Sequence, residues 1–304
     1  MSNAKQKLII ILNGVSRHKK KFYQQIFPDL STQYQIDVWE TKHAKHAIEL
    51  GSEATRQRPF GILAAGGDGT LNQVINGVMA VATPSEIPTI GIIPLGTGND
   101  FARMCGIEPN TNSLLSKIKS GGKPTDLGKV VCQSESGESL TRHFINVASL
   151  GLGPDVVKRL FKSNRALGPT LTYFKAIAQS FFSYKPEQIS VKTEQWSWSG
   201  KIRVVAIANG QSFGHSLYVA PDAKADDGLF STLIAGEVPV LKFLMLLQKI
   251  KSKKKINDPL LHYNTCTNLS ITSTEKCWIE TEGELAGTLP ATIEILPLAI
   301  KFFR

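Results

Sequence analysis

The sequence predicts an α/β N-terminal domain, Rossmann-like with a mostly parallel sheet, followed by an antiparallel β-sandwich domain. Strand and helix patterns alternate over residues 1–127, and from residue 128 onward the apolar segments become short, β-rich and separated by turn residues. The chain has 304 residues, 42% of them hydrophobic, which exceeds the usual size of one domain and can fill two cores. We therefore expect one domain over residues 1–127 and a second over residues 128–304.

The N-terminal elements follow from apolar periodicity. The helix that begins after Thr70 has apolar residues at the i, i+3, i+4, i+7 and i+8 positions that bury one helical face. The apolar run that ends at Asn13 is short and reads as a first strand rather than a signal peptide. In order, we expect a strand at 7–12, a helix at 22–30, a strand at 35–41, a helix at 44–56, a strand at 60–65, the helix after Thr70 and a strand at 89–96.

The C-terminal half is typical of an antiparallel sandwich or barrel interrupted by helices. Helical patterns occur around 154–183 and 238–253, and the final strand could return to the first domain. We expect strands within 143–149, 188–194, 201–209, 229–236, 268–274 and 291–296.

The net charge of +10 favours a negatively charged partner. Basic runs occur at 17–21 and 249–255, and nucleic acid, an anionic membrane and a phosphate-bearing substrate all fit them. We do not expect nucleic-acid binding, because the basic clusters lack interleaved stacking aromatics. The four cysteines have no CxxC spacing, which favours a reduced, cytoplasmic setting without a zinc site. No apolar run reaches the roughly 18 to 20 residues of a membrane span.

The stretch "GGDGT" at 66–70 joins a buried strand to a helix. Glycines allow a ligand to approach bare backbone, and the start of a helix presents unpaired N–H groups to anions. A purely structural turn that needs small residues would explain the glycines equally well.

A second glycine turn, "PLGTGNDFAR" at 94–103, follows the next strand and favours the functional interpretation. Two such turns at adjacent strand ends could hold a polyphosphate between their backbone N–H groups. The carboxylates of Asp68 and Asp100 would repel phosphate directly, so we expect a divalent cation or a water network beside them. The common nucleotide fingerprints GxxxxGK[ST] and GxGxxG are both absent.

These two turns, followed by "DLG", "FINVASLGLG", "PDAKADDGLF" and "TEGE" in that order, closely resemble the YegS-type bacterial lipid kinases. That family is related to the catalytic domains of diacylglycerol and sphingosine kinases, and the resemblance runs from about residue 7 to the C-terminus. It implies that the domain over 1–127 binds a nucleotide, that the sandwich over 128–304 binds a lipid, and that ATP and the lipid meet in a cleft between them. "GGDGT" alone is less specific, because NAD kinases and phosphofructokinases have a related turn.

The resemblance also implies a nucleotide site and a magnesium site. The magnesium ligands would be the carboxylate of Asp227 and the backbone carbonyls of Lys224 and Leu229, and such hard oxygen ligands suit Mg²⁺. A simple surface turn would explain this stretch as well. The implied ATP contacts, extended here to both glycine turns, are Thr41, Gly66, Gly67, Asp68, Gly69, Thr70, Leu71, Asn72, Gln73, Gly96, Thr97, Asn99 and Asp100.

The catalytic base of the family lies in a DGE motif, which reads Glu282-Gly283-Glu284 in this chain. Glu282 replaces the usual Asp, and its extra methylene moves the carboxylate by about an ångström, which matters in a positioned site. We therefore expect Glu284 to accept the proton of the lipid hydroxyl, with Glu282 as the alternative and Asp68 as the next carboxylate to consider.

The sequence thus predicts a cytoplasmic, peripherally membrane-associated lipid kinase that uses ATP and Mg²⁺. Its lipid would be diacylglycerol-, phosphatidylglycerol- or sphingoid-like, and its oligomeric state stays open, a homodimer being one option. The alternatives are an NAD kinase-like enzyme and a catalytically silent lipid- or nucleotide-binding regulator.

Two features also stay open. Asp126 either joins the polar network of Asp68 or starts a linker strand, and the basic amphipathic segment 238–255 either rests on anionic lipid or packs in the core.

Overall fold

The computed structural model describes residues 5–163 and 169–304. The chain forms two compact units. The N-terminal unit contains the residues up to Asp126 together with Pro297–Arg304, and the C-terminal unit contains Leu127–Leu296. The first unit is an α/β layer with parallel strands and the second is built from antiparallel strands, so the predicted fold class is confirmed.

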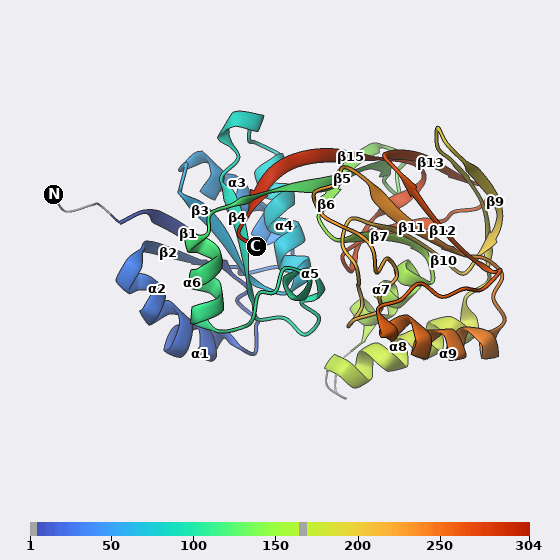
Figure 1. The fold of residues 1–304 in the computed structure, drawn as a ribbon, viewed down its shortest axis with the longest axis horizontal. Helices are drawn as coiled ribbons and strands as arrows, with labels where there is room; N and C mark the ends of the chain where they lie inside the picture. The colour runs from blue at the N-terminus through green and yellow to red at the C-terminus, as the bar shows by residue number, and fades with distance from the viewer. Residues whose placement is uncertain (1–4, 164–168) are drawn as a thin grey trace. The chain divides into compact units, whose positions relative to one another are not determined.

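The N-terminal unit has a parallel sheet with strand order β2-β1-β3-β4 (Figure 1). Its strands are β1 (Lys7–Leu12), β2 (Gln35–Glu40), β3 (Gly61–Gly66) and β4 (Thr89–Pro94). Its helices are α1 (Lys19–Lys21), the π-helical η1 (Phe22–Ile26), α2 (Phe27–Gln33), α3 (His46–Arg56), α4 (Asp68–Met79), the 3₁₀ turn η2 (Pro84–Glu86), α5 (Asp100–Met104) and α6 (Thr111–Lys119).

Helices cover this sheet because the strands are apolar on both faces. Along β1, Leu8, Ile10 and Leu12 pack in one core cluster with residues of η1, α2 and α6. The alternate residues Ile9 and Ile11 are also fully buried, as expected for a strand whose side chains point alternately to two covered faces. The parallel arrangement brings the carboxyl ends of all four strands to the same edge.

Two parts of the helical layer differ from the sequence prediction. The predicted helix at 22–30 is a continuous helical segment over 19–33, and it passes through a π-helical turn in which the Phe27 N–H bonds the Phe22 carbonyl. Pro28 follows directly and has no N–H for a regular helical bond, which explains the wider turn there. Helix α6 was not predicted, although the side chain of Asn110 caps it by accepting the Ser113 N–H at 2.8 Å.

The C-terminal unit is a set of mainly antiparallel strands with three helices. One run has the order β12-β11-β10-β7-β14-β15, and β15 also pairs with β13 and β5, β13 with β8, and β8 with β9. The elements are β5 (Lys123–Gln133), β6 (Ser139–Phe144), β7 (Val147–Gly151), α7 (Leu152–Lys162), α8 (Pro169–Ser183), β8 (Glu187–Lys192), β9 (Ser197–Ile202), β10 (Val204–Ala208), β11 (Phe230–Ala235), α9 (Val240–Lys249), the 3₁₀ turn η3 (Ile250–Ser252), β12 (Leu261–Cys266), β13 (Asn268–Ser273), β14 (Trp278–Thr281) and β15 (Glu284–Phe302).

The predicted strand at 143–149 is broken into β6 and β7 at Ile145 and Asn146. The N–H groups of these two residues bond a side chain, that of Glu282, instead of a neighbouring strand. The predicted helical pattern over 154–183 corresponds to α7 and α8, and its residues 164–168 lie outside the described residues. Strands β12 and β14 were not predicted.

The core of the C-terminal unit is apolar and aromatic. Phe144 and Phe230 stack in it with ring centroids 5.6 Å apart. Helices α7, α8 and α9 form a separate layer, in which Phe181 of α8 stacks on Phe243 of α9 at 4.4 Å. In the described part of the chain, no helix combines the length and apolarity needed to cross a bilayer.

The end of β15 belongs to the N-terminal unit. Phe302 pairs with Ile90 of β4, and its ring meets that of Phe101 edge to face with the centroids 5.2 Å apart. Both Phe302 and Asp126 are fully buried, and the Asp126 carboxylate accepts the Leu298 N–H at 2.7 Å. The last residues of the chain therefore help to build the core of the first unit.

We predict that Phe302→Ala lowers the free energy of unfolding of the N-terminal unit by roughly 3–5 kcal/mol, the usual cost of removing a buried aromatic ring. Lys301→Ala is the matched control, because Lys301 is the exposed neighbour on the same strand. Urea denaturation of both variants would measure the difference. Equal stability of the two would mean that the returning strand contributes nothing to the core.

Candidate active site

The predicted nucleotide residues lie along one edge of the parallel sheet. Backbone hydrogen bonds join the strand ends there: the Asn13 N–H bonds the Ala65 carbonyl at 2.9 Å, and the Leu95 N–H bonds the Gly66 carbonyl at 2.8 Å. At the outer strand, the Gly14 N–H donates to the Thr41 hydroxyl at 3.0 Å. The structure thus brings together residues from four strand ends, where ligands of such sheets usually bind.

The two glycine turns pack directly against each other. A Cβ atom at Gly96 would lie 2.3 Å from the Gly67 Cα and 2.9 Å from the Gly67 nitrogen, so no side chain fits at Gly96. Asn99 closes the second turn through both ends of its amide, accepting the Gly96 N–H at 3.1 Å and donating to the Gly96 carbonyl at 2.8 Å. Asn99 itself has a left-handed φ of 52°. Bare backbone from two turns therefore meets at this edge.

Asp68 links the two turns electrostatically. Its carboxylate accepts the N–H groups of Asp100 at 3.1 Å and Phe101 at 3.3 Å, at the start of α5. Burial and then the nearby Asp100 carboxylate raise the pKa of Asp68, while these backbone hydrogen bonds lower it. Asp100 in turn pairs with Arg103 at 2.8 Å. Both carboxylates thus have protein partners, so neither depends on a cation alone for compensation.

The other predicted nucleotide residues differ in what they can offer a ligand. Leu71 is fully buried and its N–H bonds the Gly67 carbonyl at 3.1 Å, so neither its side chain nor its amide is available. Asn72 is buried, and its side-chain oxygen accepts from Asn76 at 3.2 Å. Gly69, Thr70 and Gln73 are partly exposed, and Thr97 is exposed. The geometry therefore favours the turns and the first helical turn of α4 over the positions that follow.

The sequence assigned no role to three residues at this edge, although Asn13 was expected at the end of the first strand. The Asn13 amide donates to the Thr70 hydroxyl at 3.3 Å, and His18 Nδ1 lies 2.9 Å from the Leu95 carbonyl. Arg103 also donates to the Gly98 carbonyl at 2.6 Å and so braces the second turn. Asn13 ends a predicted strand and Arg103 closes the second motif, so both carried a local signal that could have identified them.

In the C-terminal unit, Glu282 and Gly283 form the two-residue loop between β14 and β15. Thr281 pairs with Glu284 across the loop, and both loop residues have positive φ, 53° at Glu282 and 85° at Gly283. Two consecutive positive φ angles define a type I′ hairpin, which prefers Asn or Asp followed by Gly. The Asp expected from the family motif would therefore also suit the backbone, and Glu282 holds a conformation that Glu adopts less readily.

The Glu282 carboxylate is held by two backbone amides. Its Oε1 accepts the Ile145 N–H at 2.7 Å and the Asn146 N–H at 2.6 Å. The buried amide of Asn209 fixes the same segment by donating to the Ile145 carbonyl at 2.7 Å. Glu284, the first residue of β15, is partly exposed. The two predicted catalytic carboxylates thus lie on one hairpin but have different surroundings.

A third acid, Glu280, lies behind this hairpin and was not predicted. It is 2% exposed, its Oε2 accepts the Gly283 N–H at 2.8 Å, and its Oε1 accepts a hydrogen bond from the Ser149 hydroxyl. Burial raises the pKa of Glu280 to about 7, although both hydrogen bonds act in the opposite direction. No short motif marks this residue, because Ser149 lies 131 positions away in the sequence.

The predicted magnesium loop is exposed at Lys224, Asp227 and Leu229. Asp227 Oδ1 accepts the Leu229 N–H at 3.1 Å, which folds the loop around the carboxylate. The donor types expected here, one carboxylate and two backbone carbonyls, are hard oxygen ligands, so these residues fit Mg²⁺ in their chemistry.

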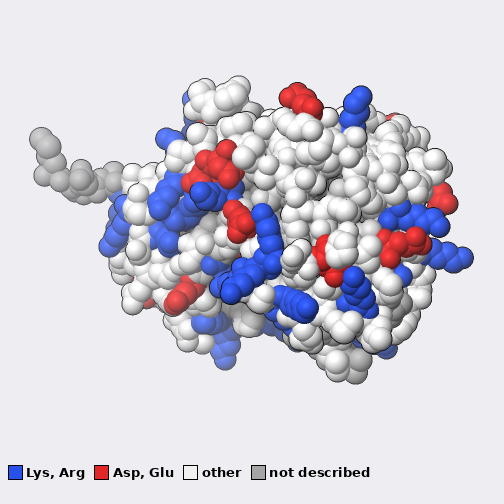
Figure 2. All heavy atoms as spheres, turned by 45° about the vertical axis from the view of Figure 1, so that its right-hand side comes forward, with Lys and Arg blue, Asp and Glu red and all other residues white. Residues whose placement is uncertain are grey.

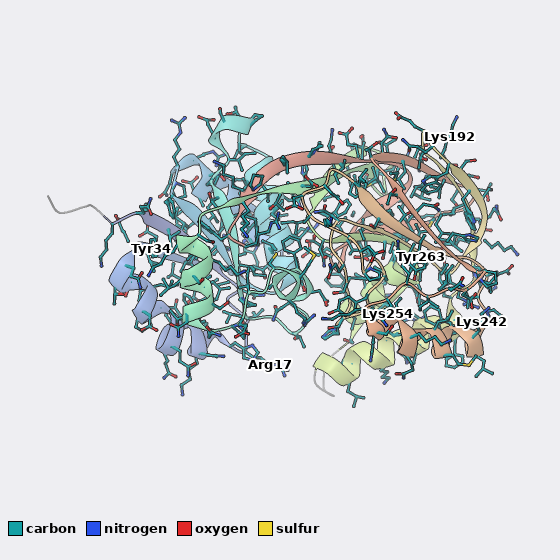
Figure 3. The ribbon with its side chains drawn as sticks, viewed as in Figure 1. Arg17, Tyr34, Lys192, Lys242, Lys254 and Tyr263 are labelled. Carbon is teal, nitrogen blue, oxygen red and sulfur yellow. The ribbon has the colours of Figure 1, made fainter. Side chains whose placement is uncertain are left out.

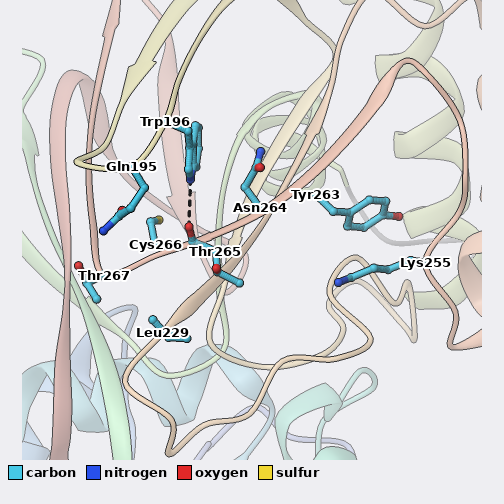
Figure 4. A pocket seen from close by; sticks show the side chains of 9 residues that line it. All are labelled: Gln195, Trp196, Leu229, Lys255, Tyr263, Asn264, Thr265, Cys266 and Thr267. Carbon is cyan, nitrogen blue, oxygen red and sulfur yellow. Dashed lines mark hydrogen bonds between the residues drawn. The ribbon is translucent and has the colours of Figure 1, made fainter.

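Leu229 also lines a cavity of about 520 Å³ in the C-terminal unit (Figure 4). Trp196 stands over one side and donates from Nε1 to the Thr265 carbonyl at 2.9 Å. The lining is half apolar and half polar, and no predicted catalytic residue belongs to it. Its residues are Gln195, Trp196, Leu229, Lys255, Tyr263, Asn264, Thr265, Cys266 and Thr267.

His43, His46 and Glu49 are the one group of ligand-type side chains found within metal-binding reach among the described residues. His46 Nδ1 accepts the Lys42 N–H at 3.0 Å, which uses the lone pair of the neutral ring and leaves the proton on Nε2. Because a metal needs that lone pair, we assign no metal to this group.

Two families match the sequence. The diacylglycerol kinase catalytic domain matches residues 7–130, and the YegS C-terminal NAD kinase beta sandwich-like domain matches residues 147–304. The second match alone covers more than half of the chain.

Individual relatives agree with these matches. A diacylglycerol kinase of Bacillus subtilis (strain 168) is 28% identical over 84% of this chain and 82% of its own length. A Yersinia pestis (strain Pestoides F) protein named "Probable lipid kinase YegS-like" is 29% identical over 87% of this chain and 84% of its own. A crystal structure of a diacylglycerol kinase from Bacillus anthracis str. Sterne superposes with a TM-score of 0.72 at 20% identity, covering 99% of this chain and 98% of that one, which supports the fold.

The raised pKa of Glu280 predicts how stability depends on pH. Between the ordinary carboxyl pKa of about 4.3 and a folded-state value of about 7, the folded protein holds a proton that the unfolded chain has released. The free energy of unfolding should therefore fall as the pH rises through this window and level off above it. Glu280→Gln removes this effect, so the melting temperature of the variant relative to wild type should rise from pH 5 to pH 8.

Glu275→Gln is the control for that measurement, because Glu275 is exposed and lies shortly before the same strand. Its melting temperature should track that of wild type at every pH. A constant offset between Glu280→Gln and wild type would contradict the assignment of the titration to Glu280.

Proposed function

Because the chain belongs to the diacylglycerol kinase catalytic domain family with a YegS-type C-terminal domain, we propose that it is an ATP-dependent lipid kinase that phosphorylates a hydroxyl of a membrane lipid. The proposal is carried by one combined observation. Both family domains occur in this chain, and at one edge of its parallel sheet the backbones of two glycine turns are in contact. The Bacillus subtilis relative is named a diacylglycerol kinase, so diacylglycerol is the first substrate to test.

The N-terminal unit would hold the nucleotide. The Gly67 turn and the start of α4 offer N–H groups and bare backbone to the phosphates. Gly96 offers bare backbone only, because its N–H already bonds the Gly66 carbonyl and the Asn99 amide oxygen. Asp68 already caps α5, so we propose that it sets the distance between the two turns rather than accepting a proton. The hydroxyls of Thr41 and Thr70 stand near the neighbouring strand ends and could contact the rest of the nucleotide.

The C-terminal unit would supply the proton acceptor. Both glutamates are partly exposed, but Glu282 is committed to two amides through Oε1, which fixes its position, whereas Glu284 begins β15. We therefore propose Glu284 as the group that accepts the proton of the lipid hydroxyl, with Glu282 as the residue that orients the loop. Mg²⁺ at Asp227 would neutralise charge in the loop over residues 224–229. Mg²⁺ bound with ATP would neutralise charge on the phosphates.

Two other functions make different predictions. An NAD kinase-like enzyme would phosphorylate NAD instead of lipid. A silent regulator would bind nucleotide or lipid without turnover, and the replacement of Asp by Glu282 in the family motif is the one feature that favours it.

The proposal is tested with purified protein, labelled ATP, Mg²⁺ and a panel of acceptors in mixed micelles: diacylglycerol, phosphatidylglycerol, sphingosine and NAD. We expect labelled product with a lipid and none with NAD. Glu284→Gln should lower kcat roughly 10²- to 10⁴-fold with little change in the KM for ATP, the range typical of a lost general base.

Glu282→Asp is the matched variant, since it restores the usual family residue and suits the positive φ. It should retain or raise activity. Turnover of NAD alone would favour the NAD kinase-like function, and no turnover with any acceptor would favour the regulator. Wild-type rates in Glu284→Gln would place the proton acceptor elsewhere.

We also propose that the helical layer of the C-terminal unit docks on an anionic membrane. Large apolar side chains are exposed on all three helices, including Phe161 on α7, Phe182 on α8 and Leu241 on α9, the last two at 72% exposure. The residues after α9 are rich in lysine and include Lys254, whereas Lys242 lies on α9 and pairs with Asp258 at 2.9 Å (Figure 3). Over the face drawn in Figure 2, basic side chains are interspersed with acidic ones rather than forming one continuous stripe. Apolar side chains beside lysines fit a lipid surface with anionic headgroups.

Leu241 and Met245 lie four residues apart, so they share one face of α9. The double variant Leu241→Ser/Met245→Ser should reduce cosedimentation with phosphatidylglycerol vesicles by roughly tenfold, because each lost side chain removes apolar area from the lipid contact. Val81→Ser, an exposed apolar residue of the N-terminal unit, is the control and should bind as wild type. Unchanged binding of the double variant would contradict docking through α9.

A further inference from the structure

The turn that carries Glu282 and Glu284 is held from behind by a buried acid. Glu280 precedes the hairpin loop by two residues and faces the protein interior at 2% exposure. Its Oε2 accepts the N–H of Gly283, the residue between the two candidate catalytic carboxylates. One hydrogen bond therefore connects a residue without access to substrate to the centre of the proposed acceptor site.

Glu280 is itself locked by its neighbours. It pairs directly across the sheet with Ser149 of β7, which donates to its Oε1. The first turn of α7 covers this pair, because a Cβ at Gly153 would lie 2.2 Å from the Ser149 hydroxyl and 3.3 Å from Glu280 Oε1. The carboxyl thus has two fixed hydrogen bonds and no space in which to move.

A hydrophobic residue would be the ordinary choice at such a position. The neighbours of Glu280 in the sequence, Ile279 and Thr281, are equally buried. Burial of a carboxyl group costs free energy unless its hydrogen bonds compensate for the lost solvation. The benefit here is geometric. Glu282 and Gly283 both have positive φ, and nothing lies within 4 Å of a Cβ at Gly283, so packing does not fix the loop at Gly283.

We propose that Glu280 is a positioning residue for phosphoryl transfer: through the Gly283 N–H, and with Ser149 as its anchor, it fixes the direction of the turn that presents Glu282 and Glu284. This inference rests on the proposed kinase function. Glu282 is held separately by the amides of Ile145 and Asn146, so two sets of hydrogen bonds fix the loop. Loss of either set should leave the fold in place and misdirect the carboxylates, and a displacement of about 1 Å can reduce turnover about 10²-fold.

Three variants separate positioning from stability. Glu280→Ala removes both hydrogen bonds. Glu280→Gln keeps them, because its amide oxygen can accept from Gly283 while its NH₂ group donates to the Ser149 hydroxyl. Thr232→Val is the control for stability, since it removes a buried hydroxyl of the same unit that bonds the Asn264 carbonyl at 3.1 Å, away from the hairpin.

The first readout needs no activity. Hydrogen exchange of the segment 278–286 is measured in each variant at a temperature well below its melting point. We expect exchange to rise at least tenfold in Glu280→Ala and to stay at the wild-type level in Glu280→Gln and Thr232→Val. Unchanged exchange in Glu280→Ala would overturn the positioning role, whether or not the protein is a kinase.

The second readout is kinetic and uses whichever lipid wild type phosphorylates. We expect Glu280→Ala to lower kcat roughly 10- to 100-fold with the KM for ATP within about twofold of wild type, and Glu280→Gln to restore kcat to within about threefold. Equal kcat loss in Glu280→Ala and Thr232→Val would reduce Glu280 to a stability residue. An inactive wild type whose Glu280→Ala variant still exchanges faster would refute the proposed function and leave the structural role of Glu280 intact.

Discussion

The backbone contact between Gly67 and Gly96 is the constraint on which the nucleotide half of this protein depends. It excludes a side chain at Gly96 and leaves a Cβ at Gly67 only 3.2 Å from the Gly96 Cα, and Asp68 maintains it by capping α5 from the neighbouring strand end. The parallel order β2-β1-β3-β4 then brings Thr41 and Asn13 to the same edge through ordinary strand pairing. The glycine-rich composition of the two motifs therefore fits one close approach of their backbones, which leaves bare backbone where phosphates can bind.

In the C-terminal unit, backbone hydrogen bonds fix the hairpin that carries Glu282 and Glu284. A two-residue hairpin carries the proposed proton acceptor, and backbone amides and a buried acid hold that hairpin from both sides. The break between β6 and β7 has its cause here, since Ile145 and Asn146 donate to Glu282 instead of to a strand. Sheet regularity is interrupted at the position where the site needs its donors, which is a common arrangement in functional sites.

Periodicity and glycine patterns predicted the fold class, most of the strands and both turns, because these depend on residues that are close in the sequence. The pattern of Leu71, Val74 and Val78 predicted α4, for example. The same apolar face is buried in the structure, so Leu71 cannot make the ligand contact that was expected of it. Helix α6 was missed although Leu114, Leu115 and Ile118 follow the helical spacing after the capping residue Asn110, whereas β12 contains several polar residues and β14 is only four residues long. Glu280 was beyond local reasoning, since its burial depends on Ser149 and Gly153 from distant strands and helices. Asp68 was predicted at the site, but its role as a cap of α5 required the pairing of β3 with β4.

The most direct test of the account is calorimetric titration of a non-hydrolysable ATP analogue with Mg²⁺ into wild type and Gly96→Ala. The added methyl group cannot fit beside Gly67 unless the backbone shifts, so the account predicts at least a tenfold loss of affinity in the variant, measured below its lowered melting temperature and with a circular dichroism spectrum close to wild type. Equal affinity for the analogue in the two proteins would contradict the claim that the paired glycine turns bind the phosphates.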